Sequence, residues 1–258
     1  MLKTITSRDN AVLKLARSLH KKRGREKNGR YFAEGVRLVN DAISFVPNQI
    51  DCIIVSEKFF SENGDFINTL DKDGKIVYST SDKAFREICD TETPQGIAAI
   101  LKFPPEAEND FNKMEYVLVL DGVSEPGNMG TIIRTAEAAG IECICLSRGC
   151  ADIYSPKVVR SAMGSVFRMR FCKFDTDTVK ELKSAGFKIA ATALYNSMPI
   201  ENAGLKGKRA IVIGNEAHGV SPEVLAESDV AVRIEMKGDA ESLNAAVAAG
   251  IAMYMLRP

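Results

Sequence analysis

The sequence predicts an α/β protein of two domains, in which short strands alternate with helices. Three observations lead to this prediction. The chain has 258 residues, about 1.7 times a typical domain length of roughly 150. Its composition, 45% hydrophobic and 26% charged, excludes a disordered or fibrous protein. Strand-like and helix-like apolar runs alternate along the chain, and a polar stretch with two prolines interrupts them at Lys102–Met114.

The first half of the chain predicts a compact α/β unit. Helices are expected where apolar residues recur every three or four positions, as at Val36, Val39 and Ile43. Strands are expected where a short apolar run lies between turn residues. In chain order the expected elements are helices at 10–20 and 35–45, a strand at 51–55, a helix at 57–70, a strand at 75–78, a helix from Ser81 and a strand at 96–101.

The second half predicts a largely parallel sheet. Its first strand, Tyr116–Leu120, is a nearly continuous apolar run, which suits a strand covered on both faces. Strands that alternate with helices favour parallel pairing through right-handed crossovers. We therefore expect a first domain at 1–103, a linker at 104–114 and a second domain at 115–258. The elements expected in the second domain are helix 130–140, strand 143–147, helix 176–185, strands 187–192 and 209–213, and helix 241–256.

Charge is balanced over the whole chain but uneven locally. The 34 basic and 34 acidic residues argue against a protein that coats nucleic acid non-specifically. Residues 14–30 nevertheless contain a cluster of basic residues with the single acid Glu26. A charge run is usually a solvated helix face, but this one is unusually one-sided. Its basic residues are Lys14, Arg17, Lys21, Lys22, Arg23, Arg25, Lys27 and Arg30.

The sequence disfavours membrane and secreted proteins. No apolar run approaches the roughly 20 residues that cross a bilayer. The first residues, Met1–Thr4, lack the apolar core of a secretory signal. Six cysteines without regular spacing predict reduced thiols, so we expect a cytoplasmic protein.

Three of the cysteines can be interpreted as metal ligands or as strand residues. Cys143 and Cys145 would point to one face of a strand, with Cys150 nearby, but no histidine or cysteine pair matches them. A buried strand is the favoured interpretation, and no metal is predicted.

The first of three segments that can carry chemistry is Asp121–Gly140, where a strand ends in a loop before a helix. Ligands of open α/β sheets bind at the carboxyl ends of strands, so a site is expected in this loop. Arg134 lies about 200° around the helix from Ile132 and therefore points away from the core. It is either a solvated surface residue or a site residue. The glycines do not follow the G-x-G-x-x-G dinucleotide pattern.

The second segment, Ile211–Glu223, runs from an apolar strand into a glycine-rich turn. Glycines let backbone amides approach a ligand closely. Glu216 is either an ordinary turn carboxylate or a site residue, and His218 is favoured as a loop residue rather than a ligand or base. Ser221 and Pro222 have the pattern of a helix cap.

The third segment, Ile234–Tyr254, contains an alanine-rich helix that is apolar on most of its faces. A helix without a polar face needs protein on more than one side, which predicts a subunit interface. Ser242 and Asn244 lie at the expected first turn, where capping is the ordinary role.

The order and spacing of these segments resemble the SpoU/TrmH group of the SPOUT RNA methyltransferases. The matching patterns are N-x-G-x-x-x-R at 128–134, G-N-E-x-x-G at 214–219 and E-S-L-N-x-x-V-A at 241–248. The first half is similar to the substrate-binding domain of these enzymes through Arg30–Gly35 and Thr93–Gly96. The resemblance implies a smaller, ribosomal-protein-like (L30e-like) α/β domain followed by a parallel-sheet SPOUT domain with a trefoil knot.

The resemblance also implies an activity and its partners. These enzymes transfer a methyl group from S-adenosylmethionine to a ribose 2′-hydroxyl of RNA. We expect ribosomal RNA rather than transfer RNA, and a homodimer formed through the C-terminal helix and the knot. The basic cluster would then contact RNA phosphates at Lys14, Arg17, Lys21, Lys22, Arg23, Arg25 and Arg30.

Site residues are implied position by position. The expected catalytic residues are Arg134, Asn128, Glu216, Ser242 and Asn244. The expected cofactor contacts are Gly214, Asn215, Gly219, Ile234, Met236, Leu243 and Thr192. A guanidinium, with a pKa above about 12, is a poor base. We therefore interpret Arg134 as a clamp on an RNA phosphate, with the hydroxyl proton leaving through phosphate, water or Glu216.

Two alternative functions stay open. A methyltransferase-like RNA-binding protein without cofactor is disfavoured, because all five expected catalytic positions are present. An unrelated α/β nucleotide enzyme is disfavoured, because the Rossmann and P-loop patterns are missing.

Overall fold

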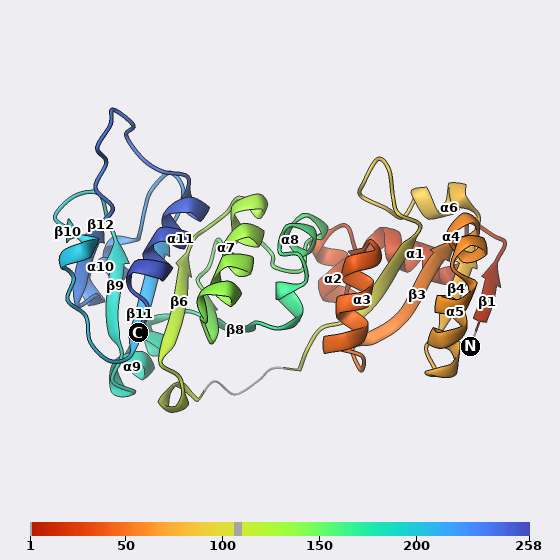
Figure 1. Ribbon diagram of the computed structural model, residues 1–258, viewed down its shortest axis with the longest axis horizontal. Coiled ribbons are helices and arrows are strands. Elements are labelled where there is room, and N and C mark those ends of the chain that lie inside the picture. The colour runs from red at the N-terminus through yellow and green to blue at the C-terminus, as the bar shows by residue number, and fades with distance from the viewer. Residues whose placement is uncertain (1, 106–109) are drawn as a thin grey trace. The chain divides into compact units, whose positions relative to one another are not determined.

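The computed structural model describes residues 2–105 and 110–258 (Figure 1). The chain forms two compact units. The N-terminal unit comprises Met1–Glu106 and Asp152–Phe167, and the C-terminal unit comprises Ala107–Ala151 and Arg168–Pro258. Among the described residues, no helix is both long and apolar enough to span a bilayer. Residues 106–109 of the predicted linker lie outside the described residues, and the predicted domain boundaries stay a prediction.

The N-terminal unit is built on a mixed five-stranded sheet with the order β1-β4-β3-β5-β2. β5 runs antiparallel to both β2 and β3, and the other pairs are parallel. The central strands β3 and β5 are almost completely buried, as their apolar sequences predict. The strands are β1 (Leu2–Ile5), β2 (Arg30–Glu34), β3 (Ile50–Ser56), β4 (Val77–Thr80) and β5 (Ile97–Lys102).

Helices cover this sheet and bury their apolar stripes against it. One face carries a core that includes Leu13 of α1, Phe32 of β2 and Phe85 of α6. α3 packs against β2 and β5, and α4 packs against β3. The helices are α1 (Ala11–Ser18), α2 (Lys22–Asn28), α3 (Val36–Phe45), α4 (Glu57–Glu62), α5 (Gly64–Lys72) and α6 (Asp82–Arg86).

A later segment of the chain, Asp152–Phe167, completes the N-terminal unit. Its helix α8 (Pro156–Ser161) contacts β2, and a short 3-10 helix, η2 (Ser165–Phe167), follows. Arg25 is 3% exposed and donates two hydrogen bonds to the Asp152 carboxylate, at 2.6 and 3.0 Å. The ring of Tyr154 packs 4.7 Å from that of Tyr31. This segment is therefore held by a buried ion pair and by aromatic contacts.

The C-terminal unit is built on a seven-stranded sheet with the order β10-β12-β9-β11-β6-β7-β8, and all of its pairs are parallel. The predicted α/β architecture with a parallel C-terminal sheet is confirmed, whereas the knot stays a prediction. The strands are β6 (Tyr116–Asp121), β7 (Cys143–Leu146), β8 (Arg170–Lys173), β9 (Lys188–Thr192), β10 (Met198–Pro199), β11 (Arg209–Gly214) and β12 (Val230–Arg233).

Helices cover both faces of this sheet. Val117 and Val119 of β6 share a core with α9 on one face, and the alternating residues Leu118 and Leu120 are buried on the other. α11 packs against α7 and β11 (Figure 1). The elements are η1 (Phe111–Lys113), α7 (Pro126–Ala139), α9 (Thr176–Ser184), η3 (Ile200–Asn202), α10 (Pro222–Glu227) and α11 (Ala245–Met255).

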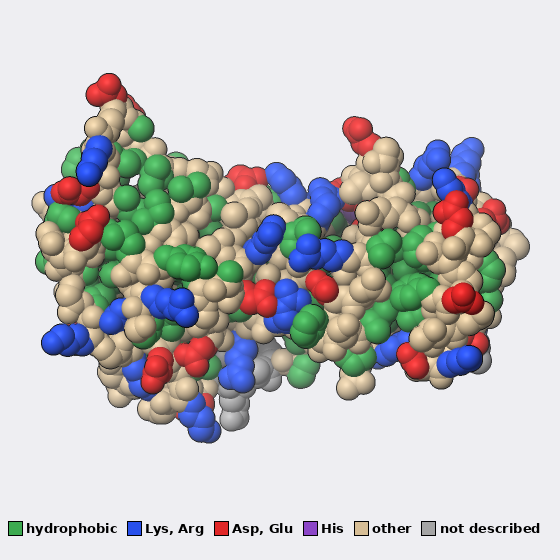
Figure 2. All heavy atoms as spheres, in the orientation of Figure 1, with side chains coloured by type: hydrophobic (Ala, Val, Ile, Leu, Met, Phe, Trp, Pro, Cys, Tyr) green, Lys and Arg blue, Asp and Glu red, His purple; other side chains and the backbone are tan. Residues whose placement is uncertain are grey.

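The last helix, α11, keeps part of its apolar surface exposed in the single chain. Ala249, Ala252 and Met253 are completely buried. Val247 and Tyr254 on its other faces are 51% and 53% exposed. Figure 2 shows hydrophobic side chains gathered on the face where Figure 1 labels α11.

Several predicted elements are wrong in their bounds or were missed. The helix expected at 57–70 is two helices, because the chain leaves helical geometry at Asn63, where φ is −129°. The last helix begins at Ala245 rather than 241. The strand expected at 75–78 lies two residues later. Seven short elements were not predicted, namely β1, β2, β8, β10, β12, α2 and α8.

Candidate active site

The site is built where β6 and β11 end side by side. Ile213 pairs with Leu120 and Gly214 with Asp121, so the loops that follow the two strands start at the same edge of the sheet. The Asn215 side chain donates to the Gly122 carbonyl at 2.8 Å and so joins these loops. Parallel strands place their carboxyl ends together, which is where ligands of such sheets bind.

The turn after β11 is closed by its own backbone. The amides and carbonyls of Asn215 and Gly219 exchange two hydrogen bonds of 2.9 Å each. The Asn215 side-chain oxygen also accepts from the Ala217 and His218 amides, at 2.9 and 3.1 Å. A side chain on Gly214 would collide with this turn, since an added Cβ would lie 2.0 Å from the Gly219 carbonyl carbon. The predicted glycine-rich turn is therefore a tight cradle of backbone groups.

Glu216 reaches from this turn into the loop after β6. One of its carboxylate oxygens accepts from the amide and hydroxyl of Ser124, at 3.1 and 3.2 Å. The other accepts from the Glu125 amide at 3.1 Å and from the Asn128 side chain at 3.0 Å. Glu216 is thus the centre of a network and not an ordinary turn carboxylate.

The electrostatics of Glu216 follow from these donors. Partial burial favours the neutral acid and would raise its pKa. The hydrogen bonds from Asn128, from its own amide and from the amides of Ser124 and Glu125 favour the carboxylate and outweigh burial. Together they lower the pKa of Glu216 to about 2. The side chain is therefore a fixed anion at neutral pH.

A pH titration tests this network. Because the pKa of Glu216 is lower in the folded protein than its ordinary 4.5, the carboxylate stabilises the joined loops fully above about pH 4.5 and loses this effect as the pH falls through about 2. Carboxyl ¹³C NMR should give a midpoint near 2, with exchange of the Ser124 and Glu125 amides rising over the same range. The Glu216→Gln variant, which lacks the titrating group, is the control. A Glu216 midpoint near 4.5 would contradict the network.

Asn128 and Asn244 extend the network to the last helix. Asn128 lies in the first turn of α7, where Glu125 caps its backbone amide at 2.6 Å. The Asn244 side chain donates to the Asn128 side-chain oxygen at 2.9 Å and also caps α11 by accepting from the Ala246 amide at 2.9 Å. Asn244 therefore combines the capping role with a contact to the site. Three of the five expected catalytic residues, Asn128, Glu216 and Asn244, are joined directly.

The other two, Arg134 and Ser242, lie outside this hydrogen-bond network. Arg134 is on α7 and is exposed, as its position relative to Ile132 predicts. Within residues 2–105 and 110–258, no hydrogen bond or ion pair engages its guanidinium. Ser242 is exposed and precedes α11 rather than lying in its first turn. Arg134 thus presents an uncommitted cation to solvent.

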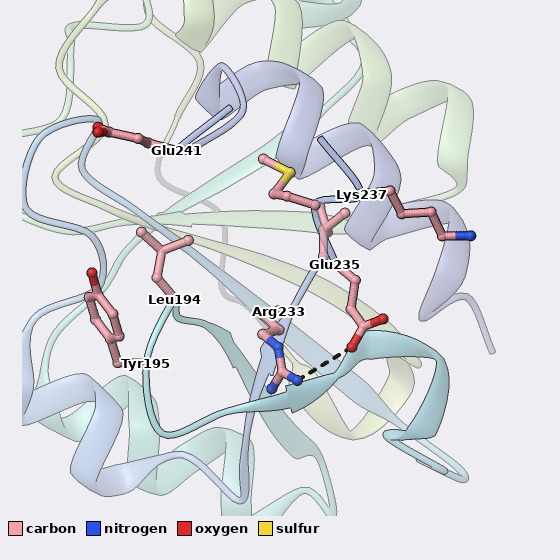
Figure 3. A pocket seen from close by; sticks show the side chains of 8 residues that line it. Leu194, Tyr195, Arg233, Glu235, Lys237 and Glu241 are labelled. Atoms are coloured by element: carbon pink, nitrogen blue, oxygen red, sulfur yellow. Dashed lines mark hydrogen bonds and ion pairs between the residues drawn. The ribbon is translucent and has the colours of Figure 1, made fainter. Parts of the chain in front are cut away.

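A hollow of about 450 Å³ opens at the ends of β9 and β12, in the same unit (Figure 3). Ile234 and Met236 line it, as the cofactor prediction requires. Leu194 and Tyr195 lie on the loop after β9, and Arg233 is paired with Glu235 at 3.4 Å on the facing segment (Figure 3). Thr192, at the end of β9, donates to the Val212 carbonyl at 3.0 Å. Leu243 is half-buried shortly before α11.

Most residues that line this hollow were not predicted from the sequence. Leu194 and Tyr195 follow the strand expected at 187–192, so the rule about strand ends would have found them. The end of β12 gave no such signal, because that strand was not predicted. The missed lining residues are Leu194, Tyr195, Arg233, Glu235, Lys237 and Glu241.

The basic cluster is only partly a surface. Lys14, Lys21, Lys22 and Arg23 are exposed. Arg25 is a correction: it is buried, and its guanidinium also donates to the Leu19 carbonyl at 2.7 Å, so it cannot reach RNA in this conformation. Arg17 is half-buried and donates to the Arg8 carbonyl. Arg30 is half-buried and pairs with Asp51 at 2.7 Å.

Comparison with known proteins gives matches over the whole chain. Residues 115–254 match the SpoU rRNA methylase family, and residues 10–99 match the MRM3-like substrate-binding domain. The chain is 37% identical to the 23S rRNA (guanosine(2553)-2′-O)-methyltransferase RlmP of Bacillus subtilis, over 99% of this chain and 100% of the relative. An AdoMet-bound rRNA methyltransferase from Sinorhizobium meliloti superposes with a TM-score of 0.86 at 29% identity, covering 98% of this chain and 97% of that one. A second solved structure, an RNA 2′-O ribose methyltransferase, superposes with a TM-score of 0.80 at 26% identity, covering 98% of this chain and 97% of that one.

Proposed function

Because the chain belongs to the SpoU rRNA methylase family and is an S-adenosylmethionine-dependent RNA ribose 2′-O-methyltransferase, we propose that it methylates ribosomal RNA. The similarity to RlmP, which acts on 23S rRNA and matches over both units, supports this substrate. The match of residues 10–99 to a substrate-binding domain adds support. Transfer RNA is the alternative.

Mapping of 2′-O-methylated nucleotides tests the substrate. Total RNA from a strain that lacks the gene should miss one modification in ribosomal RNA, and the purified protein with S-adenosylmethionine should restore it. The loss of a transfer RNA modification, with ribosomal RNA unchanged, would replace the proposal by its alternative. RNA that stays fully methylated in the deletion strain would contradict both.

The described residues fit the cofactor. Leu194, Ile234 and Met236 give the hollow an apolar side that suits a purine. The turn from Gly214 to Gly219 is a cradle that a Cβ would fill, so its backbone groups can approach a ligand closely. We assign these residues, with Asn215, Thr192 and Leu243, to the cofactor site. When bound, S-adenosylmethionine supplies an electrophilic sulfonium methyl group.

In this proposal Arg134 binds a phosphate beside the target ribose. An exposed and uncommitted guanidinium has the planar pair of donors that matches a phosphate. Its charge favours the alkoxide character that the 2′-hydroxyl oxygen gains as it attacks. Ser242, exposed before α11, is proposed as a further contact to the RNA or cofactor.

Glu216 organises the site in this proposal and does not accept the proton. A carboxylate with a pKa of about 2 holds a proton too weakly to act as a general base at neutral pH. Its four hydrogen bonds instead fix the loops after β6 and β11 against each other. The proton therefore leaves to water, because a phosphodiester oxygen is no stronger a base than this carboxylate.

The exposed part of the basic cluster is proposed to contact RNA. The Lys21→Glu, Lys22→Glu, Arg23→Glu triple variant is expected to weaken RNA binding. It should also reduce the slope of log affinity against log salt by roughly 2 to 3, because each lost phosphate contact lowers that slope by about 0.7 to 0.9. Filter binding to ribosomal RNA, at salt concentrations from roughly 50 to 300 mM, measures the affinity and its dependence on salt.

A matched control makes the same charge change elsewhere in the unit. Lys58, Lys72 and Lys83 are exposed on α4, α5 and α6. Changing these three to glutamate should leave most of the slope intact. If the triple variant at Lys21, Lys22 and Arg23 has the same slope as the wild-type protein, these three residues do not contact RNA.

We also propose a homodimer formed through α11. The exposed apolar residues Val247 and Tyr254 on this helix support it. The Val247→Lys variant should halve the mass measured by sedimentation equilibrium, because a dimer would bury the charge without a partner. Phe45→Lys, an equally exposed apolar position of the N-terminal unit at 54%, is the control. A wild-type protein that sediments as a monomer would contradict the dimer.

A further inference from the structure

Three cysteines from two strands come together on one face of the C-terminal sheet. Cys143 and Cys145 are two residues apart on β7, so their side chains lie on the same face of the sheet. Cys172 of β8 is the register partner of Cys145 and shares this face. The Cys172 Sγ lies 2.9 Å from that of Cys145 and 3.7 Å from that of Cys143. All three Sγ atoms lie within 4.8 Å of one another. Cys150, which follows β7 in the chain, is not a member, since its thiol contacts the Leu120 carbonyl at 3.2 Å.

This spacing is close to that of a thiolate metal site. Zinc binds thiolates at about 2.3 Å with tetrahedral geometry, which separates two sulfur atoms by roughly 3.8 Å. The Cys143 and Cys172 sulfurs already have this separation. The Cys145 and Cys172 sulfurs would have to part by about 1 Å, which small side-chain rotations can supply. Isolated buried cysteines pack as small apolar residues, but three in mutual contact offer three soft ligands.

The surroundings can complete such a site. Cys172 lines a hollow of about 410 Å³ together with Glu181 and Thr178 of α9, so an ion can enter from solvent. A water molecule or the Glu181 carboxylate can supply the fourth ligand from this hollow. Arg170, the register partner of Cys143, carries a positive charge beside the cluster. That charge offsets the net −1 of a zinc ion with three thiolates.

We propose that Cys143, Cys145 and Cys172 form a binding site for Zn²⁺. Each Zn–S bond forms as one thiol releases its proton to solvent, so binding of one ion releases up to three protons and involves no change of oxidation state. The ion joins β7 to the edge strand β8. The chain between these two strands contains Asp152–Phe167, which belongs to the N-terminal unit. The bound ion would therefore hold together the two strands from which this segment leaves and to which it returns.

Metal binding by the full-length reduced protein tests the proposal without any assay of methyl transfer. Wild-type protein incubated with Zn²⁺ and desalted should retain one equivalent by elemental analysis and should melt at a higher temperature than the metal-free protein. Co²⁺ should give the intense visible and near-ultraviolet absorption of a thiolate site. Wild-type protein that retains no Zn²⁺ overturns the proposal, whatever the variants do.

Two single variants locate the site. Cys172 lies on an edge strand and is partly exposed, so the fold should tolerate the Cys172→Ser substitution. It should lower Zn²⁺ affinity at least roughly 100-fold, measured by competition with a chromophoric chelator. Cys89→Ser, a partly buried cysteine of the N-terminal unit, should leave affinity unchanged. Equal affinity for Cys172→Ser and wild-type protein would place any bound zinc elsewhere and overturn the assignment.

The closest sulfur pair also allows a different result. Thiol titration of protein purified in air, compared with the six thiols of the structure, distinguishes a zinc site from a disulfide. Six reactive thiols in the denatured metal-free protein agree with a zinc site. A loss of two thiols, with a disulfide mapped to Cys145 and Cys172 and no zinc uptake after reduction, would overturn the proposal in favour of a redox pair.

Discussion

Arg134→Lys is expected to lower kcat/KM for RNA methylation by roughly 10²- to 10³-fold, the usual loss when one transition-state donor is removed. Lysine keeps the positive charge but loses the planar pair of N–H groups that binds a phosphate through two parallel hydrogen bonds. The affinity for S-adenosylmethionine should stay unchanged, because Arg134 lies on α7 and does not line the hollow at β9 and β12. Single-turnover transfer of a labelled methyl group, with calorimetry for the cofactor, measures both quantities.

The size of the loss distinguishes two roles of the arginine. A residue that acts by charge alone would keep near-normal turnover as lysine, and that result would reject the phosphate clamp. Arg257→Lys, a change at an exposed arginine of the same unit, should leave turnover unchanged. Equal losses in both variants would point to a general effect of the substitution rather than to the site.

The strands that the sequence predicts well are those whose own residues form a continuous apolar run. Tyr116–Leu120 and Ala210–Ile213 are continuous apolar runs, and both lie in buried strands of the parallel sheet. The edge strand β1 has the sequence LKTI with three exposed residues, and β8 has RFCK with none buried. Such strands are formed by pairing with a neighbour, which no local pattern records.

The sequence predicted the loops that form the site but not the hydrogen bonds between them. The glycine-rich turn and the loop after β6 were both recognised as places for a ligand. One of the hydrogen bonds that join them, from Asn128 to Glu216, crosses 88 residues of sequence. The role of Glu216 changed for the same reason: its four donors come from the loop after β6 and from the first turn of α7, and they turn a possible base into a fixed anion. Burial of Arg25 also depends on a distant partner, Asp152.

Gly214→Ala is expected to weaken cofactor binding by roughly 100-fold or more while the rest of the protein stays folded. The methyl group would lie 2.0 Å from the Gly219 carbonyl carbon and 2.1 Å from the Val220 amide nitrogen, and both are backbone atoms that cannot rotate away. The turn must open, which breaks the paired hydrogen bonds between Asn215 and Gly219. Overpacking of this kind costs about 3 kcal/mol or more, which corresponds to a loss of roughly 100-fold in affinity. Calorimetric titration with S-adenosylmethionine, supported by circular dichroism, measures the effect.

Gly219→Ala is the informative comparison, because it changes the other end of the same turn for a different reason. Gly219 has φ of +70°, and an added Cβ there would meet nothing within 4 Å. Alanine at 219 therefore suffers only the left-handed backbone strain, about 1 to 2 kcal/mol. Its affinity should fall less than that of Gly214→Ala, and Gly64→Ala, with neither strain nor contact, should bind as the wild-type protein does. If Gly219→Ala were the weaker binder of the two, conformational strain rather than close backbone approach would govern this turn.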